Sequence, residues 1–103
     1  MTTLKLTLSY KPFQVMKTGE KDVEFRRKSK WIESRLFDKK GNIRNYTNVE
    51  FVNGYGTTKP RFTTGFKDVI LLEAGHTFSY SNGLTVNLTE PTYMIRLGPI
   101  IEQ

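Results

Sequence analysis

The stretch that decides the fold is residues 4–27, LKLTLSYKPFQVMKTGEKDVEFRR, in which two alternating segments flank a helical one. Three leucines alternate with polar residues over 4–8, a pattern typical of a strand with one buried face. Residues 11–19 predict a short helix, with a proline in the first turn and a glycine at the C-terminal end. Residues 21–27 return to a period of two. The chain is therefore expected to open with a strand, a helix and a second strand.

The rest of the chain predicts one more helix and then only strands and turns. Residues 29–37, SKWIESRLF, favour a second helix with Ser29 as its N-cap. From residue 47 onward the segments are β-rich, and residues 76–88 predict a hairpin around a Ser-Asn-Gly turn. Because helices and strands do not alternate regularly, we expect one α+β domain, residues 1–103. Its core is expected to be a small twisted sheet or barrel of five to six strands, with two short helices near the N-terminus.

Composition narrows the classes of function. The chain has 103 residues and no cysteine, which excludes disulfides, a thiolate nucleophile and cysteine-ligated zinc. His76 is the only histidine and is expected in a surface turn, so we expect no metal site and no cofactor. The N-terminus lacks a signal-peptide pattern and no apolar run reaches membrane-spanning length, so a cytoplasmic protein with no membrane partner is expected. The oligomeric state is left open.

The positive charge is concentrated in the first two thirds of the chain. Residues 1–67 carry 15 Lys or Arg and 6 Asp or Glu, a net charge of +9, whereas residues 68–103 carry one Arg and four acids, a net charge of −3. A basic region of this kind favours nucleic acid as a partner. A solvated lysine-rich surface explains the same composition equally well.

Residues 18–31, TGEKDVEFRRKSKW, hold the candidate functional residues. Alternation places Val23 and Phe25 on one side of a strand, and Glu24 and Arg26 on the other. One interpretation is an exposed face with weak cross-strand ion pairs. The other is a ligand site, because arginines next to flat aromatic rings are typical of single-strand nucleic-acid binding. Trp31 fits either a core position or a stacking platform, and Tyr55 is a second candidate platform.

These motifs resemble the ASCH domain family of the PUA-like superfamily. The opening residues resemble its strand, helix and turn, here Thr18-Gly19-Glu20-Lys21, followed by a strand that carries Glu24 and Arg26. The continuation is similar to a small phage and bacterial subgroup. Its features correspond here to a helix with Trp31, Arg35 and Leu36, the segment FVNGYGTTKPRF at 51–62, and the closing YMIRLGPII at 93–101. The resemblance covers nearly the whole chain.

The resemblance implies a small PUA-like β-barrel that binds RNA or a modified nucleotide in a basic cleft. The cleft would be lined by the Gly-x-Lys turn, the Glu-x-Arg strand and the Asn-Gly-Tyr-Gly hairpin. Arg26 and Lys21 would hold a phosphate or a carbonyl. Glu24 would either accept a hydrogen bond from a base amino group or hold Arg26 in place. The remaining candidate ligand-binding residues are Trp31, Arg35, Asn53, Gly54 and Tyr55. For Gly54 and Gly56 a tight turn with positive φ is the preferred explanation.

Two alternatives stay open. Some ASCH-like proteins are amidohydrolases for acylated cytidine or ribonucleases, which would make Lys21 a general base and Glu24 a proton carrier. Against this, Glu24 stands where those amidohydrolases have a threonine, and a neighbouring carboxylate is expected to keep the lysine charged. Lys21 and Tyr55 are the best pair for a ribonuclease. The second alternative is a phage protein-interaction module, which would need the apolar residues 69–72 on the surface, whereas we expect them in a buried strand.

Overall fold

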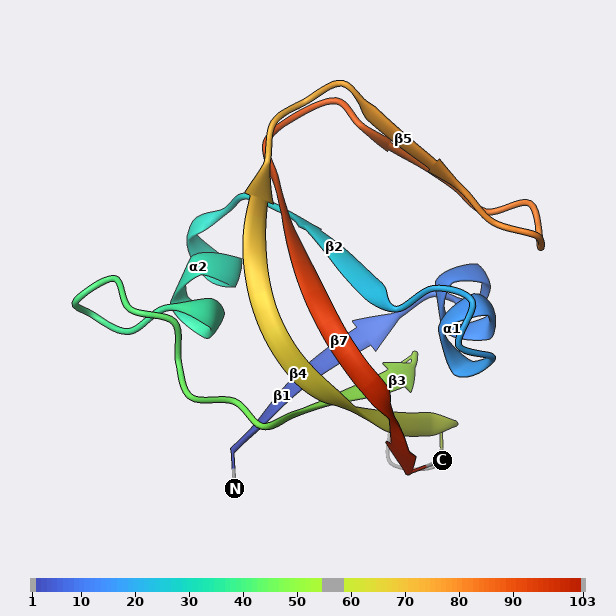
Figure 1. Cartoon of the computed structure of the whole chain (residues 1–103), viewed down its shortest axis with the longest axis horizontal. Coiled ribbons are helices and arrows are strands. Elements are labelled where there is room, and N and C mark those ends of the chain that lie inside the picture. Colours follow the sequence, from blue (N-terminus) through green and yellow to red (C-terminus); the bar gives the residue numbers. More distant parts are fainter. Residues whose placement is uncertain (1, 55–58, 103) are drawn as a thin grey trace.

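The computed structural model describes residues 2–54 and 59–102 as a curled sheet with two short helices and a separate hairpin (Figure 1). The α+β class expected from the sequence is confirmed, and five strands form the curled sheet. In chain order the elements are β1 (Thr3–Leu8), α1 (Tyr10–Lys17), β2 (Val23–Arg27), α2 (Lys30–Leu36), β3 (Asn48–Asn53), β4 (Arg61–Leu72), β5 (His76–Ser79), β6 (Thr85–Leu88) and β7 (Thr92–Glu102).

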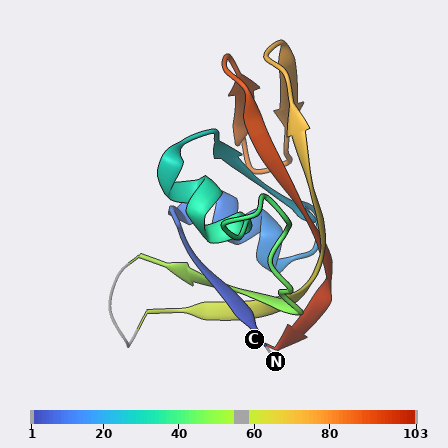
Figure 2. The same cartoon turned by 90° about the vertical axis from the view of Figure 1, so that its left-hand side faces the viewer.

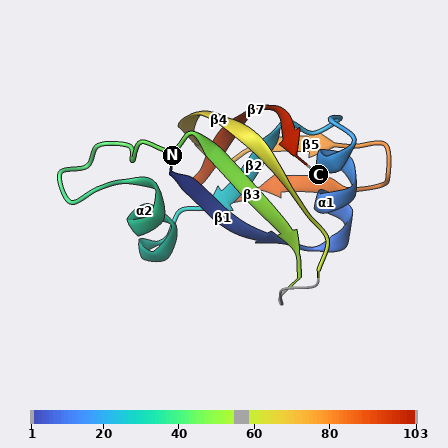
Figure 3. The ribbon, with the colours of Figure 1, turned by 90° about the horizontal axis from the view of Figure 1, so that it is seen from below.

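The strand order of the main sheet is β1-β3-β4-β7-β2. β1 and β3 run parallel and the other neighbours are antiparallel. β4 and β7 are long and bend strongly, so the sheet curls into half a barrel (Figures 1 and 2). From below, β1, β3 and β4 lie side by side across the molecule (Figure 3). β1 and β2 are therefore the two open edges of an incomplete barrel.

Both helices lie on the concave side of the sheet and fill it (Figure 2). Each offers an apolar face, with Phe13 and Met16 from α1 and Ile32 and Leu36 from α2. Neither helix is long and apolar enough to cross a membrane, and no other helix occurs in residues 2–54 and 59–102. The core they complete consists of Leu4, Leu6, Leu8, Phe13, Met16, Ile32, Leu36, Val49, Phe51, Phe62, Tyr93, Ile95 and Leu97.

The helix ends follow the sequence signals. The Ser29 hydroxyl accepts a hydrogen bond from the Ile32 amide at 3.2 Å, which satisfies an unpaired donor of the first turn of α2. Gly19, just after α1, has a φ of +87°, a conformation that side chains other than glycine disfavour. These two residues direct the chain into and out of β2, the strand that carries the candidate site.

The predicted hairpin is confirmed as β5–β6, and it forms a ribbon apart from the main sheet. It folds back across the outer face of β2, where the ring of Phe78 lies 4.8 Å from that of Phe25. At its tip the Asn82 side chain donates to the Lys11 carbonyl (3.0 Å) and to Gln14 (2.8 Å) on α1. The hairpin therefore holds the outer side of β2 against the rest of the domain.

The expectation that residues 69–72 form a buried strand is wrong. They are the last part of β4, but Ile70 is 36% and Leu71 is 43% exposed. β3 pairs with β4 only through Arg61–Gly65, so the end of β4 has β7 as its one sheet neighbour among the described residues. An apolar run predicts burial only where a second layer covers the strand. Val69 still packs against the core, but among the described residues no such layer buries Ile70 and Leu71.

Candidate functional site

The polar row of β2 faces the inside of the curled sheet. Glu24 lies opposite Ile95 in the β2–β7 register, and Ile95 is fully buried. Residues directly opposite one another point to the same face, so Glu24 points into the concave side. Phe25 lies opposite Met94 and faces outward, under the hairpin. The charged face of β2 is therefore the interior one, and its apolar neighbour is on the outside.

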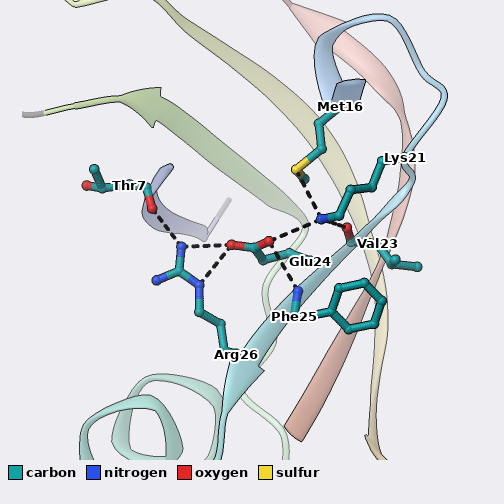
Figure 4. A network of polar contacts seen from close by, with 7 residues as sticks. All are labelled: Thr7, Met16, Lys21, Val23, Glu24, Phe25 and Arg26. Atoms are coloured by element: carbon teal, nitrogen blue, oxygen red, sulfur yellow. Dashed lines mark hydrogen bonds and ion pairs between the residues drawn. The ribbon is translucent and has the colours of Figure 1, made fainter. Parts of the chain in front are cut away.

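The carboxylate of Glu24 is the centre of a polar network (Figure 4). Its Oε1 accepts from the Phe25 amide (3.1 Å) and from Nζ of Lys21 (3.3 Å). Its Oε2 accepts from Nε of Arg26 at 2.8 Å and lies 2.8 Å from Nη2 of the same guanidinium. A carboxylate offers about four lone-pair sites, so these contacts fill its capacity. Glu24 is therefore placed to hold Lys21 and Arg26, and a base amino group would find no free acceptor on it.

Arg26 spans the gap between the two open edges of the barrel. Its Nη2 donates to the Thr7 carbonyl of β1 at 2.7 Å, while its Nε is held by Glu24. The third nitrogen, Nη1, has no partner among the described residues (Figure 4). The side chain retains 24% of its exposure. A guanidinium fixed by two contacts and free at one end is preorganised to bind an anion.

Lys21 lies deeper than Arg26 and is 3% exposed. Its Nζ donates to the Val23 carbonyl (2.6 Å) and to Glu24, and it lies 3.6 Å from Sδ of Met16. Burial lowers the pKa of this ammonium group, and the nearby carboxylate of Glu24 opposes that effect. The carboxylate favours the charged ammonium, as expected, but desolvation is the larger influence and the net direction of the pKa shift is downward.

Two adjoining hollows open beside this network. One, of about 310 Å³, lies between β2 and the end of β1, and is bordered by Lys21, Glu24, Arg26 and Arg27. The other, of about 510 Å³, is bordered by Lys5, Arg26, Trp31 and Gly54. Both share Arg26 and the backbone around residues 7–9, so they form one groove along the open edges, which we call the edge groove. Its walls carry four cationic side chains and one carboxylate.

Trp31 is a surface residue rather than a core residue, since it is 52% exposed. It stands in the first turn of α2 and borders the edge groove. The guanidinium of Arg35, one turn later, lies 5.3 Å from the centre of its ring. Arg35 borders a different hollow, together with Arg44 and Tyr46, so it supports the indole without entering the edge groove.

The turn after β3 contributes less than the sequence indicated. Gly54 borders the edge groove, but its amide donates to the Leu8 carbonyl at 3.2 Å and is not free for a ligand. Its φ of +92° supports the tight-turn explanation. Asn53 lies opposite Leu8 at the end of the β1–β3 ladder and does not border the edge groove. Tyr55 and Gly56 lie outside the described residues.

Several residues of the edge groove were missed from the sequence. Lys5, on the polar face of β1, could have been found from the alternation of that strand, and Arg27 from its place beside Arg26. Ser9 follows β1 directly and borders both hollows. Val86 comes from the distant hairpin, and no local sequence pattern predicts that it borders the groove. The charge of Arg27 is partly neutralised by Glu90, whose Oε2 lies 2.8 Å from Nε of Arg27.

The donor set of the edge groove suits an anion. Among the described residues, no group of three or more His, Cys, Asp or Glu side chains could hold a metal ion. Comparison of the chain with models of protein families, with curated proteins and with solved structures finds no match in any of the three. The resemblance to ASCH domains therefore stays a prediction from short motifs.

Proposed function

We propose that the domain binds single-stranded RNA or a nucleotide in the edge groove. The observation that carries the proposal is the position of Arg26, at the junction of two hollows with its Nη1 unpaired among the described residues. A phosphate there would meet a guanidinium that Glu24 and Thr7 already orient. Little side-chain ordering would be needed at the moment of binding.

Trp31 supports a ligand with a flat ring beside its phosphate. Its indole is half exposed, borders the same hollow as Arg26, and is backed by the guanidinium of Arg35. Stacking of one base on an aromatic side chain contributes about 1–3 kcal/mol. Free phosphate would not use this surface, whereas a nucleotide or a nucleic-acid strand would use both parts of the groove.

The roles within the site differ from residue to residue. Arg26 would contact the phosphate, with Lys5 and Arg27 as outer cations, and Trp31 would stack on a base. Glu24 is saturated by its own protein donors, so it acts as a positioning residue and reads no base. We therefore expect weak base preference, because phosphate contacts carry no sequence information.

The test is a titration with a fluorescein-labelled RNA of about eight nucleotides, a usual length for such grooves, at several salt concentrations. Three phosphate-contacting cations would give a log–log slope of about −2 for a single strand. Arg26→Ala is expected to weaken binding far more than the matched charge removal Lys39→Ala on the distant loop. Absence of binding at low salt, or equal losses for both variants, would reject the proposal.

The lowered pKa of Lys21 favours a second candidate, hydrolysis of an acylated nucleoside. Loss of a proton would leave Lys21 two hydrogens for Val23 and Glu24, and its lone pair would take the third position, which now faces Sδ of Met16. A substrate proton would have to reach that position from the hollow that Lys21 borders. The test is incubation with N4-acetylcytidine, comparing the wild type with Lys21→Met. Turnover that this substitution leaves unchanged would reject Lys21 as the base, and turnover that it abolishes would support the candidate.

A further inference from the structure

The end of β4 offers an open strand edge. β3 pairs with β4 only as far as Gly65. On the other side Phe66 and residues 68–72 pair with β7, with a bulge at Lys67. Figure 1 shows β4 continuing well past the end of β3. Beyond Phe66, whose amide donates to the Thr47 carbonyl, no other strand pairs with this edge among the described residues. Backbone N–H and C=O groups are therefore open to another strand there.

The side chains of this edge are apolar and unprotected. The segment reads KDVILLE over residues 67–73, with four uncharged apolar residues in its centre. Ile70 and Leu71 are 36% and 43% exposed. Exposed edges usually carry a lysine or a proline in their centre that prevents pairing, and this one carries neither. Its charges stand toward the two ends: Lys67 and Glu73 are exposed, and Asp68 is paired with Arg96 of β7.

We propose that this edge pairs with the same edge of a second copy of the chain, antiparallel and centred on Ile70. In that register Lys67 of each copy lies opposite Glu73 of the other, and Val69 lies opposite Leu71. Two ion pairs would then flank an apolar centre. The resulting contact is isologous, since one surface meets itself across a twofold axis.

The chemistry of the segment selects this register. Directly opposed residues in an antiparallel ladder must have the same hydrogen-bonding type and point to the same face, which restricts the shift to steps of two residues. The register centred on Ile70 places Asp68 opposite Leu72, near the end of the contact, with its charge balanced by Arg96. A shift in one direction moves Asp68 opposite Ile70 and leaves Lys67 opposite Leu71, and a shift in the other places Glu73 opposite Val69. A parallel pair in register would oppose like charges at both ends. Only the register centred on Ile70 opposes Lys67 with Glu73.

This surface is separate from the edge groove. None of residues 68–73 borders either hollow of that groove, and neither does Lys67. Self-association through β4 would therefore leave the groove of each copy open. The inference does not depend on the proposed binding function, and each can fail without the other.

The test is sedimentation velocity on the full chain from about 10 μM to about 1 mM, a range in which small isologous contacts dissociate. We expect a monomer–dimer equilibrium. Ile70→Lys, which places two ammonium groups opposite each other on the axis, is expected to raise the dissociation constant at least about tenfold. The matched control Ile101→Lys, at a 60% exposed position of β7, is expected to leave it unchanged.

A charge swap tests the register itself. Lys67→Glu alone and Glu73→Lys alone each oppose like charges and are expected to weaken the dimer, whereas the double variant restores the pairs and the affinity. Circular dichroism confirms that each variant is folded. A protein that stays monomeric throughout the range, or a dimer that Ile70→Lys leaves intact, overturns the proposal. A dimer that the double variant fails to restore overturns the register.

Discussion

Glu24→Gln is the substitution that best tests whether Glu24 stabilises the two cations beside it, Lys21 and Arg26. The glutamine keeps the size of the side chain and removes its negative charge. Lys21 and Arg26 would then share an almost buried site without a counter-charge, because Lys21 is 3% exposed and Glu24 is 5% exposed. Breaking a buried ion pair by removing one partner costs about 3–5 kcal/mol.

We expect the free energy of unfolding to fall by about 3 kcal/mol, the lower end of this range, because the Arg26 side chain keeps some solvent exposure and its hydrogen bond to Thr7. For a domain of this size, that loss lowers the midpoint of thermal unfolding by about 12–24 °C. The matched comparison is Lys21→Met, which removes the desolvated ammonium and leaves the Glu24–Arg26 pair in place. We expect that variant to stay within about 1.5 kcal/mol of the wild type.

The free energy of unfolding of these proteins is expected to depend on pH in a defined direction, which the pKa of Lys21 sets. The pKa of Lys21 is lowered in the folded state, so the unfolded chain binds its proton more tightly. Stability therefore rises with pH between the folded pKa and the ordinary value near 10.5. Without the Glu24 charge the folded pKa falls further, so the deficit of Glu24→Gln should shrink as pH rises toward 10.5.

The assay is urea unfolding of the wild type and both variants, followed by circular dichroism at pH 7 and pH 9.5. The free energy of unfolding of Lys21→Met should lack the part of the pH dependence that arises from the ionisation of Lys21. Two results would refute the assignment of Glu24 as the centre of the network. One is an equal decrease in the free energy of unfolding for Lys21→Met and Glu24→Gln, and the other is a destabilisation by Glu24→Gln that grows with pH.

Three further outcomes are expected elsewhere in the fold. Ser29→Ala removes the N-cap of α2 and should cost about 1 kcal/mol, measured by urea unfolding. Burial and a hydrogen bond to Glu33 raise the pKa of Tyr93 to about 12, so its phenol should ionise late in an ultraviolet titration. Its contribution to stability should fall as pH rises from 10 toward 12, and Tyr93→Phe should remove that dependence. Gly98→Ala would bring a Cβ to 3.3 Å from the Gly65 backbone, which should lower the thermal midpoint. An unchanged midpoint would show that β4 and β7 can separate there.

Much of the local structure could be predicted because it rests on neighbours in sequence. The alternation in β1, the cap at Ser29 and the hairpin turn each depend on a few adjacent residues. The assignment of Glu24 and Arg26 to one face of β2 needed only the period of the strand. That this face is the concave one depends on the order of strands in the sheet, which the alternation does not contain.

The remaining features depend on contacts between distant segments. The bond from Arg26 to Thr7 joins two edges that meet only because β4 and β7 curl the sheet. The helical pattern leaves Trp31 open between a core position and a surface platform, and its exposure follows from which face α2 turns to the barrel. Residues 69–72 look buried by composition, and Ile70 and Leu71 are exposed because β3 begins opposite Gly65 and does not pair with this part of β4.

The most direct test of the edge groove as the binding site is a set of ¹H–¹⁵N spectra recorded during titration with unlabelled single-stranded RNA. The signals expected to shift first are the indole N–H of Trp31, the side-chain Nε–H of Arg26 and the backbone amides of residues 7–9. Amides on the loop around Lys39, on the far end of α2, should stay in place. Shifts spread evenly over the lysine-rich surface, or a Trp31 indole signal unmoved at saturation, would contradict the account.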